Sequence, residues 1–282
     1  MRLLYVLGTS FSGSSILNAL MARHPDVLAL NELVNLGREL RAPWDGNRRH
    51  PLRQPFWCEV KEAFEAMGGR FDQLRLEWGW KHAALGGRRA RARWAREHRN
   101  LFRALGHVSN ASVFLDSSKS ARRLERLMQS GYAPRVVHIV RDGRSVCASG
   151  LKRGFSFAFM LRGVQLDWLR SEMFRRRMTP ERFMRLRFCD LVSNPREELE
   201  RICRHVGLEY HAEQLEVHRP VEHPVAIGAK GFWMLKRGLV VQPPQRARLL
   251  GSHEMLYRAG GGPLRDVSLG LQHPRGAGEG TT

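Results

Sequence analysis

Several features that would assign this chain to a common class of protein are missing or scarce. No apolar run approaches the roughly 18 residues of a membrane-spanning helix. The apolar run before Gly8 is too short for the core of a signal peptide. The four cysteines lack the paired spacing that ligates a structural metal; they are Cys58, Cys147, Cys189 and Cys203. We therefore expect a cytoplasmic, reduced protein with no membrane span and no metal.

Lysine is scarce, and acidic residues are outnumbered. Arginine accounts for 41 of the 47 basic residues, which stand against 27 acidic ones and give a formal net charge of +20. This balance predicts attraction to anions: nucleotides, sulfated or phosphorylated substrates, nucleic acid or acidic lipid. An arginine bias spread over solvated faces would give the same net charge. Charge by itself therefore does not choose a partner.

The N-terminal segment has a pattern that suits an anion-binding loop. An apolar run at 3–7, typical of a buried strand, is followed by a loop rich in glycine and serine and then by helical character at 16–21. Glycines let the backbone approach an anion, and free amide groups at a helix N-terminus supply partial positive charge. Gly8 and Gly13 have the spacing of a Walker A loop, but Ser14 stands where that motif has its lysine. The loop predicts binding of a phosphate-like group and argues against ATP or GTP hydrolysis.

Strand-like apolar runs alternate with helical segments along the rest of the chain. After the first strand we expect four more, at 27–30, 113–115, 135–140 and 183–188. Such alternation predicts an α/β fold: a three-layer sandwich with a mostly parallel central sheet and helices on both faces.

Residues 36–108 differ in character, with tryptophans, arginine clusters and helical periodicity but no strand signal. We interpret them as a helical insertion after the second strand that lies over the mouth of the sheet. Aromatic residues among basic ones could stack nucleobases, but at helical spacing tryptophans are more typical of packing. The chain would then be a single α/β domain over 1–260. Its tail, 261–282, is rich in glycine, proline and threonine, and we expect it to be disordered.

Functional groups follow four of the expected strands. The glycine/serine loop follows the first, Glu32 the second, Lys119 the third and Arg141 the fourth. In open α/β sheets, ligands bind outside the carboxyl ends of the strands. We therefore expect these groups to form one site.

Together these residues resemble the sulfotransferase family, whose members transfer a sulfuryl group from 3′-phosphoadenosine 5′-phosphosulfate (PAPS) to a hydroxyl or amine. The Ser12-Gly13-Ser14-Ser15 loop is similar to the family's 5′-phosphosulfate loop. Arg141 and Ser149 have the spacing of its 3′-phosphate motif, and a helical register can bring such a pair onto one phosphate. Segments 116–119 and 186–191 also resemble blocks of the family. The resemblance implies a fold like that of the P-loop NTPases, PAPS as donor and no metal, with the insertion as a cover on the acceptor side.

The resemblance also implies roles for particular residues. Glu32 would be the general base, as in members that use a carboxylate after the second strand. Many members carry lysine or arginine where this chain has Phe11, and Lys119 is our candidate for that missing cation, on the phosphosulfate oxygens. Lys230, in a Gly-Ala-Lys-Gly segment, or Lys236 or Arg237 after it would close on the nucleotide. The residues expected around the phosphosulfate are Ser10, Phe11, Ser12, Gly13, Ser14 and Ser15.

Three other interpretations remain open. A kinase on a related P-loop fold would need the Walker lysine and a Mg²⁺-binding carboxylate, neither of which is evident here. A non-catalytic binder of nucleotide, polyanion or RNA would leave the strand-end groups unexplained. A sulfotransferase that binds its donor without turnover is consistent with Phe11. The acceptor is also open between carbohydrate, lipid, peptide and small molecule, and we do not expect nucleic acid as a partner.

Overall fold

The five strands expected from the sequence form one central sheet. The computed structural model describes residues 1–42, 50–76, 87–216, 221, 249 and 251–271. Its strands are β1 (Arg2–Leu7), β2 (Val27–Ala29), β3 (Val113–Lys119), β4 (Arg135–Val140) and β5 (Phe183–Arg187). They lie in the order β2-β3-β1-β4-β5, and every neighbouring pair is parallel. The predicted α/β fold with a parallel central sheet is confirmed.

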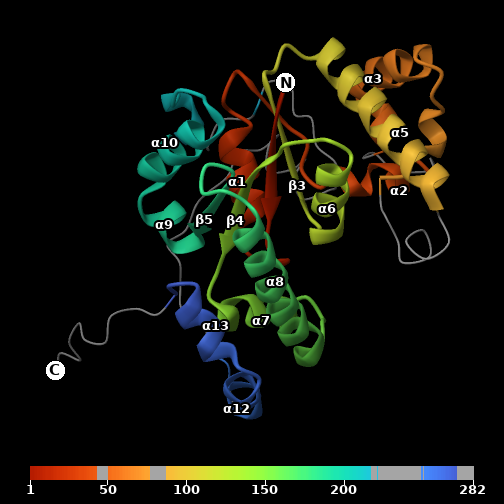
Figure 1. Ribbon diagram of the computed structural model, residues 1–282. Coiled ribbons are helices and arrows are strands. Elements are labelled where there is room, and N and C mark those ends of the chain that lie inside the picture. The colour runs from red at the N-terminus through yellow and green to blue at the C-terminus, as the bar shows by residue number, and fades with distance from the viewer. Residues whose placement is uncertain (43–49, 77–86, 217–220, 222–248, 250, 272–282) are drawn as a thin grey trace.

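Helices cover both faces of this sheet (Figure 1). In chain order they are α1 (Ser14–Met21), α2 (Leu36–Glu39), α3 (Pro55–Ala66), α5 (Gly87–Val108), α6 (Ala121–Gln129), α7 (Gly143–Leu151), α8 (Phe157–Arg177), α9 (Phe188–Ser193), α10 (Pro195–Val206), α12 (Ser252–Ala259) and α13 (Gly262–Ser268). Helices α1, α9 and α10 lie on one side of the sheet, whereas α3, α5 and α6 lie on the other. None of these helices is both long and apolar enough to cross a membrane.

The alternation of side chains along β1 creates the two cores between these layers. Leu4 and Val6 pack with apolar residues of α1 and α10 in one cluster. Leu3, Tyr5 and Leu7 pack on the other face with residues of α3, α5 and α6. Successive strand side chains point to opposite faces, so a central strand that is apolar throughout needs helices on both sides.

The start and end of α10 illustrate how local sequence fixes an element. Pro195 occupies the first turn, where its missing N–H costs no helical hydrogen bond. Gly207 ends the helix in the left-handed conformation, with φ of 71°, which glycine adopts at little cost. Asn194-Pro195 and Gly207 are typical start and stop signals of a helix in a sequence.

The insertion is helical in its described part, and its tryptophans are packing residues where they are described. Trp57 on α3 and Trp94 on α5 are 0% and 4% exposed and belong to the core cluster on the α5 face. Trp44, Trp78 and Trp80 lie outside the described residues. Helices α3 and α5 lie on the same side of the sheet as α6, next to β3 (Figure 1).

The C-terminal segment differs from the sequence-based expectation. A disordered tail was expected from residue 261 onward, but 262–268 form helix α13, in which Arg265 and Asp266 are buried. The expectation is wrong for this part because Arg265 donates to the carbonyl oxygen of Arg141 after β4, and Asp266 lies 3.7 Å from Arg144 on α7. Residues 272–282 lie outside the described part of the chain.

Candidate active site

The loop between β1 and α1 is packed so closely that its glycines cannot be replaced. Gly13 has φ of 100°, which favours glycine, and a Cβ at this position would collide with the ring of Phe188 on α9. A Cβ on Gly8 would lie 2.7 Å from the carbonyl oxygen of Ile139 on β4. The loop backbone is therefore held against its neighbours at the carboxyl end of the sheet.

Backbone strain is concentrated at the same edge. Within the described chain, the non-glycine residues with positive φ are Phe11 (66°) after β1, Asn31 (53°) after β2 and Lys119 (59°) at the end of β3. Such conformations are uncommon outside glycine. Each costs about 1–3 kcal/mol, and they cluster at functional sites because only a well-fixed surrounding structure maintains them. The strain thus marks this edge as a site independently of any motif.

Polar groups without partners lie at this edge as well. Buried polar atoms without a hydrogen-bond partner occur at several places in the described chain, and Ser12 Oγ, Asn18 Nδ2 and Asn31 Nδ2 are three of them. Ser12 is 1% exposed, so water does not readily compensate it. A buried donor left unsatisfied costs about 1–3 kcal/mol. Three such donors beside a glycine loop fit a ligand that carries several oxygen atoms.

Glu32 and Lys119, the two predicted catalytic residues, are in direct contact. Lys119 Nζ lies 2.5 Å from Glu32 Oε1, and Asn35 Nδ2 donates to Glu32 Oε2 at 2.8 Å. In the sheet register Lys119 pairs with Leu7, which places it beside the start of the glycine loop. Its side chain is 13% exposed, against 44% for Glu32. A shielded ammonium group and an accessible carboxylate therefore meet at the loop.

A buried ionic network, here called the β3 brace, lies behind this pair and consists of Asp116, Arg123 and His98. Arg123 Nε lies 2.8 Å from Asp116 Oδ2, with side-chain exposures of 1% and 0%. Ser118 Oγ donates to the same carboxylate and accepts from the backbone N–H of Val34 at 2.9 Å. The brace therefore fixes the backbone on both sides of the Glu32–Lys119 pair.

His98 joins this brace to the insertion. Its Nδ1 lies 2.8 Å from the carbonyl oxygen of Trp94, and its Nε2 lies 2.8 Å from Arg123 Nη1. Burial and the Arg123 charge hold the pKa of His98 well below its usual value. The ring is neutral, so Nδ1 donates to the carbonyl and Nε2 accepts from the guanidinium.

Arg141 at the end of β4 contacts the glycine loop directly. Its Nη1 donates to the carbonyl oxygen of Phe11 at 3.0 Å, and its guanidinium lies 4.7 Å from the centre of the Phe188 ring. Burial lowers the pKa of Arg141, although a guanidinium remains charged in proteins. The Ser149 hydroxyl donates to the Ser145 carbonyl at 2.7 Å, within α7. That Arg141 and Ser149 converge on one phosphate stays a prediction.

A second buried network, the C-terminal brace, supports Arg141 from behind and consists of Tyr257, Arg265 and Asp266. Arg265 donates to the carbonyl oxygen of Arg141 from Nη1 at 3.4 Å and from Nη2 at 3.3 Å, and it pairs with Asp266 at 2.7 Å. Tyr257 donates to Asp266 at 2.6 Å. A Cβ on Gly143 would collide with the Tyr257 hydroxyl. The C-terminal helices are thus fitted against the start of α7.

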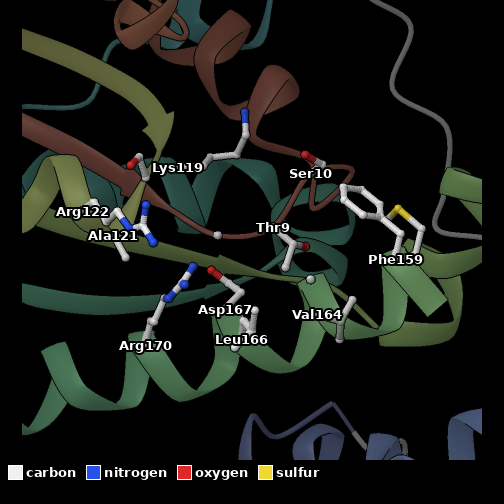
Figure 2. Close-up of a pocket in the computed structure, with 14 residues that line it drawn as sticks. Thr9, Ser10, Lys119, Ala121, Arg122, Phe159, Val164, Leu166, Asp167 and Arg170 are labelled. Atoms are coloured by element: carbon white, nitrogen blue, oxygen red, sulfur yellow. The ribbon is translucent and has the colours of Figure 1, made fainter. Parts of the chain in front are cut away.

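A cavity of about 460 Å³ opens beside the loop (Figure 2). It is enclosed by the end of β1, by the junction of β3 and α6, and by α8. The lining residues are Gly8, Thr9, Ser10, Lys119, Ser120, Ala121, Arg122, Phe159, Met160, Gly163, Val164, Leu166, Asp167 and Arg170. Of the two predicted catalytic residues, Lys119 reaches the cavity wall and Glu32 does not.

The remaining predicted residues have different outcomes. Phe11, which stands where many sulfotransferases have a cation, has the Arg153 guanidinium 5.9 Å from its ring centre. Lys230 lies outside the described residues. No described residue of the insertion lines the cavity, so its role as a cover stays a prediction.

No cluster of three potential metal ligands occurs in the described part of the chain. His138 on β4 is fully buried, and its Nε2 lies 3.5 Å from Asp167 Oδ2.

Sequence reasoning missed several residues that shape the site. Arg123 and Arg265, each 1% exposed, could not be distinguished from the many solvated arginines. Asp167 and Arg170 lie on α8, whose helical pattern gave no sign of the cavity. The adjacent Arg122 and Arg123, directly after the strand-end segment, offered one signal. Consecutive helix positions point in different directions, so one of the two arginines could be expected to face the protein interior.

Comparison with known proteins identifies the family. A profile of the sulfotransferase family matches residues 4–212. No match is found among curated protein sequences. The sulfotransferase domain of the Synechococcus PCC 7002 olefin synthase superimposes with a TM-score of 0.60 at 14% identity, over 97% of this chain and 96% of that domain. A sulfotransferase domain from the curacin biosynthetic pathway gives 0.55 at 14% identity, over 92% and 96%. These two likenesses show the three-layer, P-loop-like fold. Because the family profile matches most of this chain, the chain belongs to the sulfotransferase family.

Proposed function

We propose that this protein transfers a sulfuryl group from PAPS to a hydroxyl or amine of its acceptor by in-line displacement. One observation carries the proposal. The strained ends of β1, β2 and β3 bring a glycine loop, unsatisfied buried donors and a lysine–glutamate pair together at one edge of the sheet. Family membership makes PAPS the expected donor.

The residues at this edge suit the donor. The backbone of the glycine loop and the Ser12 hydroxyl would hold the phosphosulfate, and Arg141 would hold the 3′-phosphate. When bound, the donor supplies an activated sulfuryl group whose leaving group is a nucleotide phosphate. Lys119 would neutralise charge on the sulfuryl oxygens and on the bridging oxygen. In such transfers the protein chiefly positions the reactants and stabilises displaced charge.

Glu32 would accept the proton of the attacking hydroxyl. A new S–O bond forms to the acceptor oxygen while the bond from sulfur to the nucleotide phosphate breaks, and the acceptor proton passes to the carboxylate. The present contact between Glu32 and Lys119 restrains both groups. An anion at Lys119 would compete with that contact and leave Glu32 available as a base, which typically contributes about 10²–10⁴-fold in rate.

Calorimetric titration with 3′-phosphoadenosine 5′-phosphate, alongside AMP and ATP, tests the donor site. We expect preferential binding of the nucleotide that carries the 3′-phosphate. Because a charged hydrogen bond contributes about 1.5–3 kcal/mol, Arg141→Ala should weaken binding about 10- to 100-fold. Ser149→Ala should have a smaller effect. Arg204→Ala, at an exposed position on α10, serves as the control for nonspecific attraction to a basic protein.

Three results would count against the proposal. Equal affinity for AMP would remove the 3′-phosphate assignment, and equal losses in Arg141→Ala and Arg204→Ala would indicate binding by net charge alone. Tight binding of the nucleotide without transfer to any hydroxylated or amino acceptor would favour a protein that binds its donor without turnover.

A further inference from the structure

The cavity beside the loop has one charged end and one apolar end. Figure 2 shows Arg122 and Arg170 together at one end, with Ser10 and Phe159 at the other. Arg122 belongs to the first turn of α6 and Arg170 to α8, so two separate elements contribute a guanidinium to the same space. Among the described contacts neither guanidinium has a carboxylate partner. Two like charges facing one space repel each other unless an anion lies between them.

The rest of the wall suits a hydrocarbon segment. Met160 and Val164 on α8 are 4% and 0% exposed, and both line the cavity. In Figure 2, Val164 lies between Asp167 and Phe159 along this wall. Lys119, which the proposed function places on the sulfuryl oxygens, also lines this cavity. The cavity therefore connects the transfer position with the arginine pair. Its volume of about 460 Å³ falls within the usual range for a small-molecule site.

Asp167 is the carboxylate in the described wall, and its charge opposes binding of an anion. Its Oδ2 lies 3.5 Å from Nε2 of the buried His138, so the carboxylate is turned in part toward the sheet. Arg122 and Arg170 outnumber it at this end of the cavity. Lys119 is already paired with Glu32. The local balance is positive, and removal of the Asp167 charge should make it more so.

We propose that the acceptor of this enzyme is an amphipathic hydroxylated molecule with an anionic group, which Arg122 and Arg170 hold while its apolar segment lies along α8. A carboxylate or phosphate has the oxygen geometry that guanidinium groups bind well. The hydroxyl at the other end of the apolar segment then lies beside Lys119 and the glycine loop. The inference rests on the proposed function only in taking the ligand of this cavity as the sulfuryl acceptor.

Titration calorimetry with two probes tests the inference without requiring turnover. The probes are ω-hydroxyoctanoate and the corresponding octanediol, which share a hydroxyl and a chain but differ in the anionic group. We expect the acid to bind more tightly than the diol. Because the two arginines are exposed, Arg122→Gln and Arg170→Gln should each weaken binding of the acid by only about fivefold, and together by more than about tenfold. Affinity for the diol should not change.

Two further variants separate a specific site from general attraction. Arg162→Gln removes an arginine from the same helix that does not line the cavity, and affinity for the acid should stay the same. Asp167→Asn should strengthen binding of the acid, since it removes the opposing charge. Titration in the presence of 3′-phosphoadenosine 5′-phosphate gives an independent readout of the donor site.

The results of these titrations separate the proposed anionic acceptor from the proposed sulfuryl transfer. Equal affinities for acid and diol, no binding of either, or an equal loss in Arg162→Gln would overturn the anionic acceptor while leaving the donor site intact. Arginine-dependent binding of the acid in a protein that does not bind the nucleotide would support the cavity assignment and reject the proposed transfer. Transfer to octanediol but not to the acid would also overturn the inference.

Discussion

The two halves of the candidate active site are supported in the same way but by different parts of the chain. On the β3 side, the partly exposed Glu32–Lys119 pair is supported by the buried Arg123–Asp116 pair. On the β4 side, the backbone carbonyl of Arg141 accepts from Arg265 of the buried Arg265–Asp266 pair. The β3 brace falls within residues 4–212, which match the family, whereas the C-terminal brace lies beyond them. One support lies within the part of the chain that the family profile matches, and the other lies in the segment that follows it.

The comparison also shows a difference in how firmly each half is held. Asp116 is part of β3 itself, so the β3 brace is anchored in the central sheet. The C-terminal brace reaches the β4 loop through a backbone carbonyl at 3.3–3.4 Å. We therefore expect changes in the β3 brace to affect the whole fold. Changes in the C-terminal brace should act more locally.

The largest effect is expected from Glu32→Gln, at the front of the β3 half. If Glu32 is the general base, its loss should lower turnover by about 10²–10⁴-fold with little change in nucleotide affinity. Turnover would be measured as release of 3′-phosphoadenosine 5′-phosphate, with the best acceptor found in a panel. Glu59→Gln, an exposed change on α3, is the matched control. Turnover near that of the unaltered protein would refute the base assignment.

Arg123→Ala tests whether the β3 brace supports the fold. Removing one partner of a buried ion pair leaves the other charge unpaired, so the free energy of unfolding should fall by about 3–5 kcal/mol. Urea denaturation followed by circular dichroism measures the change. The neighbouring Arg122→Ala removes an exposed arginine and should change stability by less than about 0.5 kcal/mol. Similar losses in the two variants would mean that the buried pair has no special role.

Arg265→Ala tests the local character of the C-terminal brace. We expect nucleotide affinity to fall by up to about tenfold, because the Arg141 backbone loses a charged donor. Amide exchange should accelerate in α12 and α13 and stay slow in the sheet, since peripheral elements can open without global unfolding. Arg258→Ala, on the exposed face of α12, is the control. A loss of global stability as large as that in Arg123→Ala would remove the distinction between the two braces.

The smallest effect concerns pH. The pKa of His98 is well below its ordinary value in the folded protein because the ring is buried beside Arg123. The unfolded chain therefore binds a proton more readily, and the stability contribution present above about pH 6.5 is lost as pH falls below it. His98→Gln keeps an acceptor for Arg123 without this titration. Its unfolding free energy should depend less on pH over this range, and an unchanged slope would contradict the assignment.

The sequence was informative wherever a pattern depends on chain neighbours. Apolar runs predicted the strands, and Pro195 and Gly207 mark the limits of α10 in the sequence itself. The segment after Leu115 was expected to leave the sheet, but β3 continues to Lys119. Polar residues there remain in a strand because Asp116 is neutralised by Arg123 from the next helix. That partnership is tertiary and leaves no local signal.

The strand-end groups could be predicted because parallel topology brings carboxyl ends together whatever the intervening sequence. The cavity and the two braces could not be predicted, because they depend on which side chains of a helix face the protein interior, and that is decided by tertiary packing. Arg122 and Arg123 are adjacent, yet one lines the cavity and the other is buried in the β3 brace. Similarly, the small residues after Gly260 suggested a loose tail, and the burial of Arg265 depends on its contacts with the Arg141 carbonyl and with Asp266.

The left-handed backbone at Lys119 has a consequence for how this position can vary over evolutionary time. With φ of 59°, glycine is the residue that this backbone accommodates most easily. Glycine would also remove the ammonium group beside the loop. If Lys119 acts in the transfer as proposed, selection for stability and selection for chemistry favour different residues at this one position. A lineage released from the need for catalysis would be free to acquire glycine here and gain stability as the site was lost.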